Sequence, residues 1–352
     1  MLHYVGIMSY IKPKRLVRGD TVAVLSPSWG GPHAYPHVYE NGLKVLNEWG
    51  LKVKEFPTTR ASADFLQRNP QARAEDINNA FSDESVKAIF TSIGGTDSVQ
   101  ILPFLNKKSI AENPKIFCGF SDTSTVHTYC NTLGLTTFYG PSIMAGFSQM
   151  ESLPARYKEH VHDILFEPKA ALEYKPYSEY CDGYPDWGTK ANAGKVNELK
   201  KNAGWKWLQG NDVVQGELFG GCMPVLEKMK KTEYWPTTSF WKNKLFFLEI
   251  SENKPSMQLI EEVLRDYVKL RVFHGIRGFI FARARGFTDD EKLRLGEMIL
   301  TIVARECGRP DVPIIANFDI GHTDPQLILP LGVLAELDCL QRRVRLVEPW
   351  LE

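Results

Sequence analysis

Short apolar runs alternate with segments of helical periodicity along the first 140 residues. Buried-type strands are predicted at 21–26, 52–56, 86–93, 116–118 and 136–139. Between them, apolar residues recur at three- and four-residue spacing and predict helices over 38–49, 70–81, 98–105 and 123–133. The helix over 70–81 is polar, and its acidic and amide side chains are expected to face solvent. This repetition of strand and helix predicts a parallel, doubly wound sheet.

The second half of the chain mixes helices with further β structure. Its strands are predicted at 213–218, 244–250, 278–282 and 312–316, followed by short antiparallel strands at 326–329, 333–337 and 343–347. Between the halves, residues 166–210 carry aromatic side chains among Asp, Gly, Pro, Lys and Asn, which is typical of a linker and a long surface loop. These aromatics either stack on a flat ligand or pin the loop to the body. We therefore expect an N-terminal α/β domain over 12–165, the linker and aromatic loop over 166–210, and a C-terminal α+β domain over 211–352.

Composition narrows the class of protein. The 352 residues contain 42 Lys and Arg and 42 Asp and Glu, so no net field attracts nucleic acid or an anionic membrane. No apolar run is long enough to cross a bilayer, and the start of the chain lacks the pattern of a signal peptide. The six cysteines are scattered, without a C-x-x-C motif or a Cys/His cluster. The sequence therefore predicts a cytoplasmic protein with reduced cysteines, no metal, and no nucleic-acid or membrane partner.

Ser121 lies where a buried strand gives way to a helix, within the segment 115–125. Three Gly/Ser-rich loops, at 26–31, 94–98 and 119–124, follow predicted strands, and open parallel sheets bind ligands at the carboxyl ends of their strands. A serine in this position lies beside the first N–H groups of a helix, which favour a developing negative charge. This arrangement suits a nucleophile. The alternative is purely structural, because Ser and Asp are also the preferred residues for capping a helix.

Gly94 and Gly95 also have two interpretations. A tight turn between strand and helix needs glycine for backbone reasons alone. Alternatively, glycine lets the main chain approach a substrate, so that a backbone N–H of this loop and that of Asp122 form an oxyanion hole. The G-x-G-x-x-G and G-x-x-x-x-G-K-[ST] fingerprints of nucleotide-binding loops are absent.

A serine nucleophile needs a base, and the base needs an orienting acceptor. His322 lies in a Gly-His-Thr-Asp-Pro loop directly after a buried strand, where it is either a positioned base or a histidine bonded within its own turn. Glu249 is the one carboxylate in an apolar strand, and a buried carboxylate needs a partner such as an imidazolium. Glu252, in the following turn, is the competing candidate. The order Ser, Glu, His is that of α/β-hydrolases, but Thr123 replaces the second glycine of G-x-S-x-G, which disfavours that fold.

The chain resembles the LD-carboxypeptidase, or S66, family of serine peptidases over nearly its whole length. The motifs that carry the resemblance are Ser-Ile-Gly-Gly (92–95), Gly-Phe-Ser-Asp (119–122), Tyr-Gly-Pro (139–141), Gly-Glu-Leu-Phe-Gly-Gly (216–221), Phe-Leu-Glu (247–249) and Gly-His-Thr-Asp-Pro (321–325). The resemblance implies Ser121 as nucleophile, Glu249 and His322 as its partners, and oxyanion amides from Gly95 and Asp122. It also implies a C-terminal domain with a small β-barrel-like part, usually a homodimer, and no metal or organic cofactor.

Within that family, the length and the aromatic loop resemble the microcin C self-immunity branch more than the shorter muropeptide enzymes. The resemblance implies that Trp187 stacks on a nucleobase, with Gly94 also lining the substrate site. That branch carries a lysine after the catalytic glutamate, for which Lys254 is the candidate here. The resulting hypothesis is a serine hydrolase that cleaves a short peptide or aminoacyl-nucleotide conjugate, as in self-immunity or detoxification. One alternative is a muropeptide LD-carboxypeptidase that releases terminal D-Ala, and the other is a non-catalytic small-molecule binding module.

Overall fold

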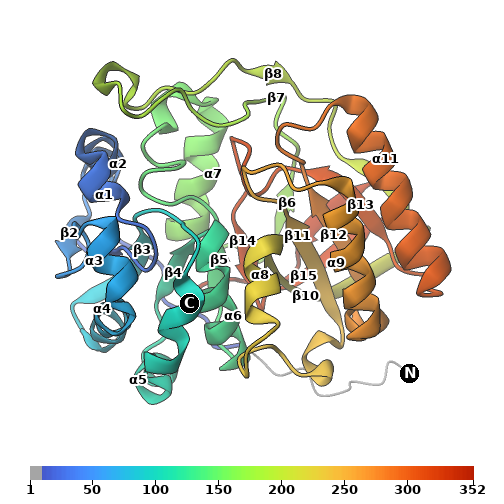
Figure 1. Ribbon diagram of the computed structural model, residues 1–352, viewed down its shortest axis with the longest axis horizontal. Coiled ribbons are helices and arrows are strands. Elements are labelled where there is room, and N and C mark those ends of the chain that lie inside the picture. The colour runs from blue at the N-terminus through green and yellow to red at the C-terminus, as the bar shows by residue number, and fades with distance from the viewer. Residues whose placement is uncertain (1–9) are drawn as a thin grey trace.

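The first sheet of the computed structural model, which describes residues 10–352, has the strand order β14-β5-β4-β3-β1-β2 (Figure 1). Neighbouring strands from β2 to β5 run parallel, and β14 pairs with β5 in the antiparallel direction. The strands are β1 (Thr21–Leu25), β2 (Lys52–Glu55), β3 (Val86–Thr91), β4 (Ile116–Gly119), β5 (Thr137–Tyr139) and β14 (Leu329–Leu331). The parallel, doubly wound sheet predicted for the first half is confirmed.

Helices cover both faces of this sheet. Their bounds are α1 (Gly31–Ala34), α2 (Pro36–Glu48), α3 (Ala63–Arg68), α4 (Pro70–Ser82), α5 (Lys107–Glu112), α6 (Ser124–Thr132) and α7 (Ala155–Phe166), with a 3₁₀ segment at Ser98–Phe104. Successive strand residues point to opposite faces. On β3, Ala88 and Phe90 accordingly pack toward α2 and α7, whereas Ile89 packs toward α4 and α6.

The second sheet has the order β6-β16-β15-β10-β11-β12-β13-β9. Its four central strands, from β10 to β13, are parallel, and antiparallel strands flank them on both sides. The strands are β10 (Val213–Cys222), β11 (Lys244–Glu249), β12 (Gly278–Ala282), β13 (Ile314–Phe318), β15 (Leu334–Asp338), β16 (Arg343–Leu346), β6 (Leu172–Tyr174) and β9 (Lys206–Gln209). The helices are α8 (Met223–Met229), α9 (Met257–Lys269), α10 (Val272–Gly275) and α11 (Asp289–Leu300), the last continuing as a π-helical turn over Thr301–Glu306.

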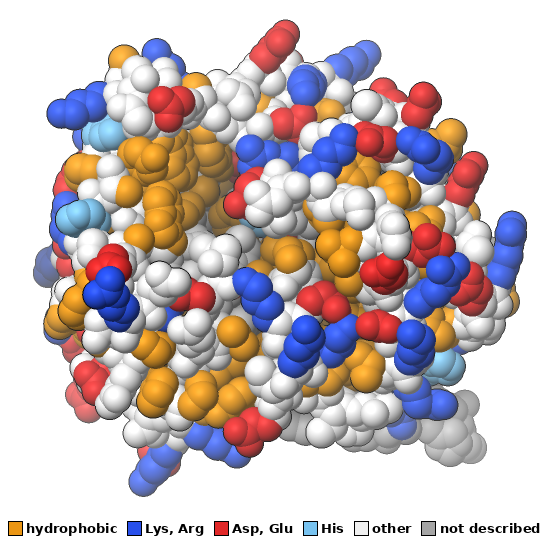
Figure 2. All heavy atoms as spheres, viewed as in Figure 1, with side chains coloured by type: hydrophobic (Ala, Val, Ile, Leu, Met, Phe, Trp, Pro, Cys, Tyr) orange, Lys and Arg blue, Asp and Glu red, His pale blue; other side chains and the backbone are white. Residues whose placement is uncertain are grey.

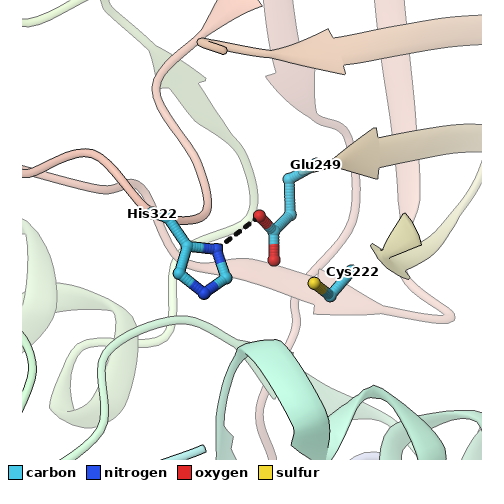
Figure 3. A group of neighbouring side chains, drawn as sticks. All are labelled: Cys222, Glu249 and His322. Carbon is cyan, nitrogen blue, oxygen red and sulfur yellow. Dashed lines mark hydrogen bonds and ion pairs between the residues drawn. The ribbon is translucent and has the colours of Figure 1, made fainter. Parts of the chain in front are cut away.

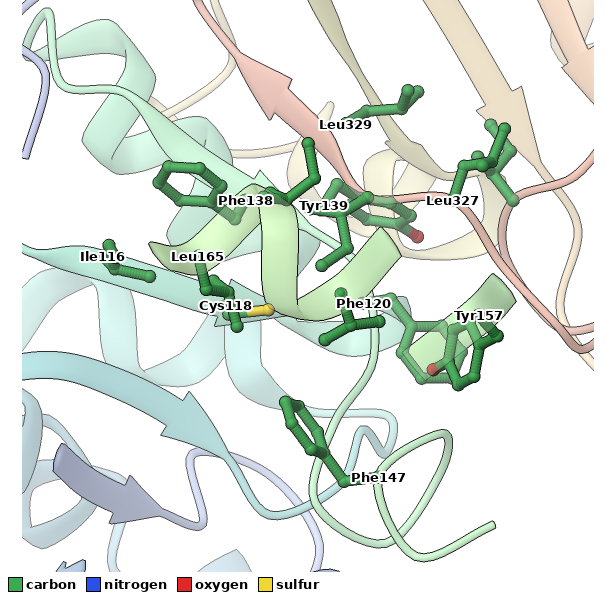
Figure 4. Packing of buried hydrophobic residues seen from close by; sticks show 14 of the residues in the cluster. Ile116, Cys118, Phe120, Phe138, Tyr139, Phe147, Tyr157, Leu165, Leu327 and Leu329 are labelled. Atoms are coloured by element: carbon green, nitrogen blue, oxygen red, sulfur yellow. The ribbon is translucent and has the colours of Figure 1, made fainter. Parts of the chain in front are cut away.

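The two sheets share a hydrophobic core. Phe247 of β11 and Ile280 of β12 belong to the same buried cluster as Phe138 and Tyr139 of β5. Figure 4 shows part of this cluster, with side chains from β4, β5, α7 and the segment before β14 packed together. Burial at roughly 25 cal/mol per Å² of apolar surface fixes the halves against each other. The carboxyl ends of β4 and β11 are thereby held at one place.

Two sequence predictions are correct only in part. The segment 166–210 is more than a surface loop, because β6 and β9 form the two edges of the second sheet and Tyr174 and Tyr177 are buried. A small ribbon of β7 (Glu179–Tyr180) and β8 (Lys200–Lys201) crosses the top of Figure 1. In α4, Gln71, Glu75 and Asn79 are exposed as predicted, but Asp76 is buried, and so is Arg73. Arg73 donates to Asp97 at 2.9 Å, and Asp76 accepts from the main-chain N–H of Thr58 at 2.7 Å.

None of the helices between residues 10 and 352 combines the length and the apolar character needed to cross a membrane.

Candidate active site

The main chain at Ser121 has the left-handed conformation that side chains rarely adopt, with φ +63°. Ser121 follows β4 and opens the 3₁₀ turn Ser121–Thr123, which leads into α6. Such a conformation costs about 1–3 kcal/mol and is concentrated at functional sites. Thr123 has φ −69°, so the position that is glycine in G-x-S-x-G has no need of one here. The structure therefore places Ser121 in a strained, half-buried turn without that motif.

The structure brings the three residues predicted from sequence into one chain of contacts. The Oγ of Ser121 lies 3.0 Å from Nε2 of His322, and Nδ1 of His322 lies 2.7 Å from Oε2 of Glu249. Figure 3 shows the imidazole of His322 facing the Glu249 carboxylate. Glu249 ends β11 and is fully buried, and His322 comes from the loop after β13. A buried carboxylate that accepts from Nδ1–H leaves Nε2 to face the serine hydroxyl.

Tyr139 is a site residue that the sequence reasoning missed. Its hydroxyl donates to Oε1 of Glu249 at 2.7 Å and accepts from the backbone N–H of Ser121 at 3.1 Å. One phenol thus joins the strained turn to the carboxylate. Its position in the sequence could have identified it, because Tyr139 ends β5 directly beside Gly119 of β4. A polar side chain at the end of the neighbouring parallel strand points to the same edge of the sheet.

We expect Tyr139→Phe to slow hydrolysis by about tenfold and to destabilise the fold by about 1–3 kcal/mol, since it leaves a buried carboxylate oxygen and a backbone N–H without their partner. Steady-state kinetics and thermal unfolding measure the two effects. Tyr157→Phe is the matched control, because the buried Tyr157 hydroxyl has no hydrogen-bond partner within residues 10–352. Equal losses in both variants would contradict a specific role for the Tyr139 hydroxyl.

The three Gly/Ser-rich loops predicted at strand ends meet around Asp122. Its buried carboxylate accepts from the Ser28 hydroxyl and, at 2.8 Å, from the backbone N–H of Ser98. A Cβ on Gly94 would lie 2.9 Å from Cβ of Ser121 and 3.4 Å from the nitrogen of Asp122. Glycine at position 94 is therefore required by the close approach of its loop to the serine. Gly95, with φ +155°, lines the cleft described next.

A cleft of about 500 Å³ opens onto Ser121 and His322. In the space-filling view the molecule is hollowed beside a group of hydrophobic side chains (Figure 2). The lining residues come from both halves of the chain and include Trp29, Phe120, Tyr184, Trp187, Glu252, Arg285 and Asp324. A cleft of this size, lined by aromatic side chains together with polar and charged ones, fits a small polar molecule.

Trp187 both pins its loop and lines the cleft. Its carbonyl oxygen lies 2.8 Å from Nε2 of His37, and its ring stacks on Tyr184 with centroids 5.6 Å apart and planes 17° apart. The hydroxyl of Tyr184 donates to Asp324, which ties the aromatic loop to the loop of His322. These contacts show that the two aromatic residues hold the loop against the body, while stacking on a ligand stays a prediction for this pair.

Lys254 lies away from these residues. Its ammonium group pairs with Glu291 at 2.9 Å and lies over the ring of Phe287, and Lys254 does not line the cleft. The expected substrate contact would require this pair to break. Glu252, the competing candidate for the carboxylate, lines the cleft. It contacts His322 too, with Oε2 3.0 Å from Nε2, so the two candidate carboxylates occupy different nitrogens of one imidazole.

These carboxylates decide the charge of His322. Burial by itself would lower the pKa of His322, but Glu249 and Glu252 outweigh burial and raise the pKa to about 10. The hydrogen bond with His322 in turn lowers the pKa of Glu252 to about 2. At neutral pH the imidazole is therefore cationic in this arrangement.

Cys222, Glu249 and His322 offer ligand atoms that all lie within 4.8 Å of one another (Figure 3). A metal would need a thiolate, whereas burial raises the pKa of the Cys222 thiol well above its usual value. Both oxygens of Glu249 already accept hydrogen bonds, from Tyr139 and His322. The donor set therefore fits a protonated hydrogen-bond network better than a metal site.

Comparison with known proteins gives matches to both halves. Residues 22–140 match the LD-carboxypeptidase N-terminal domain of the S66 peptidases, and residues 215–337 match the LD-carboxypeptidase C-terminal domain. The chain is 28% identical over 337 residues to a probable murein peptide carboxypeptidase of Bacillus subtilis, covering 94% of this chain and 92% of the relative. It is 25% identical over 339 residues to the microcin C7 self-immunity protein MccF of Escherichia coli, covering 96% and 95%. A solved structure of MccF in complex with aspartyl sulfamoyl adenosine has a TM-score of 0.85 at 26% identity, covering 97% of this chain and 100% of the other.

Proposed function

The chain belongs to the LD-carboxypeptidase (S66) family and is a hydrolase of the serine carboxypeptidase type, and we propose that Ser121, His322 and Glu249 are its catalytic triad. The observation that carries this proposal is the continuous contact from Ser121 Oγ through both imidazole nitrogens to Glu249, at the floor of a cleft. Nucleophile, base and orienting acid are recognised by this geometry rather than by sequence position.

In the proposed reaction, neutral His322 accepts the proton of the Ser121 hydroxyl while Oγ attacks an amide carbonyl of the substrate. The tetrahedral oxyanion is stabilised by the amides of Gly95 and Asp122, the pair that the close approach of Gly94 to Ser121 supports. The imidazolium then gives its proton to the leaving nitrogen, and the C–N bond breaks. Water, deprotonated by His322, hydrolyses the acyl-enzyme. Glu249 holds the tautomer throughout and stabilises the charged imidazole.

The substrate proposed is a short peptide or aminoacyl-nucleotide conjugate. The stacked pair of Tyr184 and Trp187 on the wall of the cleft supports it, since aromatic faces bind nucleobases. MccF, whose solved structure contains aspartyl sulfamoyl adenosine, has the same fold. We propose a role in self-immunity or detoxification on this basis. The expected homodimer and the cytoplasmic location stay predictions. Light scattering on the purified chain tests whether it is a homodimer.

Cleavage of muropeptides is the second candidate. Arg285 lines the cleft, so its guanidinium is a candidate partner for the terminal carboxylate of a peptide. The relative from Bacillus subtilis is named for murein peptides.

One assay separates the candidates. The purified chain is given an aminoacyl-adenylate analogue with a scissile amide and, separately, a muropeptide tetrapeptide ending in D-Ala. Preferred cleavage of the first supports the nucleotide conjugate, and release of D-Ala alone supports the second candidate. If neither is cleaved and Ser121 is also not phosphonylated by a fluorophosphonate, the assignment of Ser121 as nucleophile and the proposed substrates fail.

Trp187→Ala is expected to raise KM for the nucleotide conjugate by about 5- to 150-fold, because stacking of one base contributes about 1–3 kcal/mol. The kcat should change little, since the contacts of Trp187 are with His37, Tyr35 and Tyr184, which lie outside the triad. The matched comparison is the same variant with a conjugate that lacks the base, for which KM should stay at the wild-type value. Equal effects on both substrates would show that Trp187 positions the loop only.

A further inference from the structure

Nε2 of His322 has two partners at the same distance. Ser121 Oγ and Glu252 Oε2 each lie 3.0 Å from it. With Nδ1–H bonded to Glu249, a neutral imidazole offers only a lone pair at Nε2. A serine hydroxyl can donate to that lone pair, but a carboxylate can only accept. The contact with Glu252 therefore requires a proton on Nε2, and an imidazole in that state cannot take the proton of Ser121.

The surroundings of His322 maintain this charged state. Glu249 and Glu252 contribute two negative charges in direct contact, one at each nitrogen. Other titratable groups close to the imidazole or to its carboxylate partners are Tyr139 at the end of β5, Cys222 at the end of β10, Asp324 in the same loop and Arg285 after β12. Burial raises the pKa values of Tyr139, Cys222 and Asp324. Arg285 is the cation of this group, and its charge contributes to the lowered pKa of Glu252.

Glu252 is placed to leave His322, whereas Glu249 is not. The Glu249 side chain is fully buried and held by Tyr139 as well as by His322. The side chain of Glu252 is 51% exposed, lies in the turn after β11 and lines the cleft. A neutral ligand would strengthen the contact between Glu252 and His322, because it excludes water and lowers the local dielectric constant. A cationic group in the cleft would compete for Glu252 instead.

We propose that Glu252 binds a primary ammonium group of the substrate, on the carbon next to the scissile carbonyl, and thereby frees His322 to act as the base. This inference rests on the proposed function and narrows its substrate class to conjugates whose acyl residue has a free α-amino group. Binding such a substrate replaces the ion pair between Glu252 and His322 by one between Glu252 and the ammonium group. The proton on Nε2 is then lost to solvent, and the hydroxyl of Ser121 donates to the lone pair.

The test compares two substrates that share one leaving group and differ only in acetylation of the α-amino group. Wild type is expected to prefer the free amine in kcat/KM by about 10- to 100-fold, the range of a hydrogen bond to a charged group. In Glu252→Gln the ratio should fall toward one, and the acid limb of the pH profile of kcat/KM should move to lower pH by at least about one unit. Glu261→Gln, which alters a carboxylate paired with Arg265 on α9, is the matched control. An unchanged preference and profile in Glu252→Gln would overturn the proposal.

A second measurement needs no turnover. In Ser121→Ala, the midpoint of the His322 imidazole titration, followed by NMR, should fall by about one pH unit or more when the free-amine compound saturates the site. The N-acetylated compound should leave it unchanged. If the titration midpoint of His322 does not change when the free amine binds, Glu252 does not bind the ammonium group. If wild type cleaves neither compound, the proposed function fails, while the titration still decides whether an ammonium group displaces Glu252.

Discussion

Ser121→Ala is expected to lower kcat by at least about 10³-fold while substrate still binds. Removing Oγ removes the atom that forms the acyl-enzyme, and the remaining amides and cleft retain only the catalysis due to binding and oxyanion stabilisation. Alanine loses one half-buried hydroxyl and removes no main-chain hydrogen bond, so the thermal midpoint should stay within a few degrees of wild type. Single-turnover hydrolysis of the preferred substrate, together with its dissociation constant by calorimetry, measures both parts.

Ser124→Ala is the natural comparison for that variant. Ser124 lies one turn further on, and its hydroxyl bonds to the carbonyl of Ser121 and to the N–H of Cys222. It is expected to affect stability more than chemistry, because both bonds are to the main chain. If Ser121→Ala hydrolyses the substrate as fast as wild type, the nucleophile has been assigned wrongly.

Glu249→Gln is expected to lower kcat by about 10³- to 10⁴-fold, with a smaller effect on KM. The carboxamide has nearly the shape of the carboxylate but carries a donor, and a donor facing Nδ1 favours the tautomer with the proton on Nε2. The hydroxyl of Ser121 would then meet an N–H instead of a lone pair. The uncharged amide also ceases to stabilise the imidazolium that forms during the reaction. Pre-steady-state kinetics should show slow acylation, without accumulation of acyl-enzyme.

Glu252→Gln on the same imidazole provides the contrast. It changes the partner of the other nitrogen and is expected to shift the pH profile rather than to abolish hydrolysis. Losses of similar size and the same pH dependence in the two variants would show that Glu249 and Glu252 exchange roles. In that case the assignment of Glu249 as the orienting acid would fail.

Much of the fold follows from local pattern because a buried parallel strand must be apolar on both faces. The strands predicted at 86–93, 116–118 and 244–250 are found at 86–91, 116–119 and 244–249, and glycine or polar residues after them mark the carboxyl edge where ligands bind. The pairing of strands that are far apart in the chain could not be predicted from local pattern. The edges β6 and β9 join the second sheet and β14 joins the first, through antiparallel contacts that local periodicity does not specify.

The sequence by itself determined which residue types stand at the ends of the strands, and hence that Ser121, Glu249 and His322 were the candidates. Only the tertiary structure decided how their side chains meet. In the structure Nδ1 of His322 contacts Glu249, and Nε2 contacts Glu252. The hydroxyl of Tyr139 bonds to Glu249, and Lys254 pairs with Glu291 outside the cleft. The reason is physical. Periodicity fixes which face of an element is buried, whereas hydrogen bonds in a site depend on side-chain directions from loops that only the packed core holds in place.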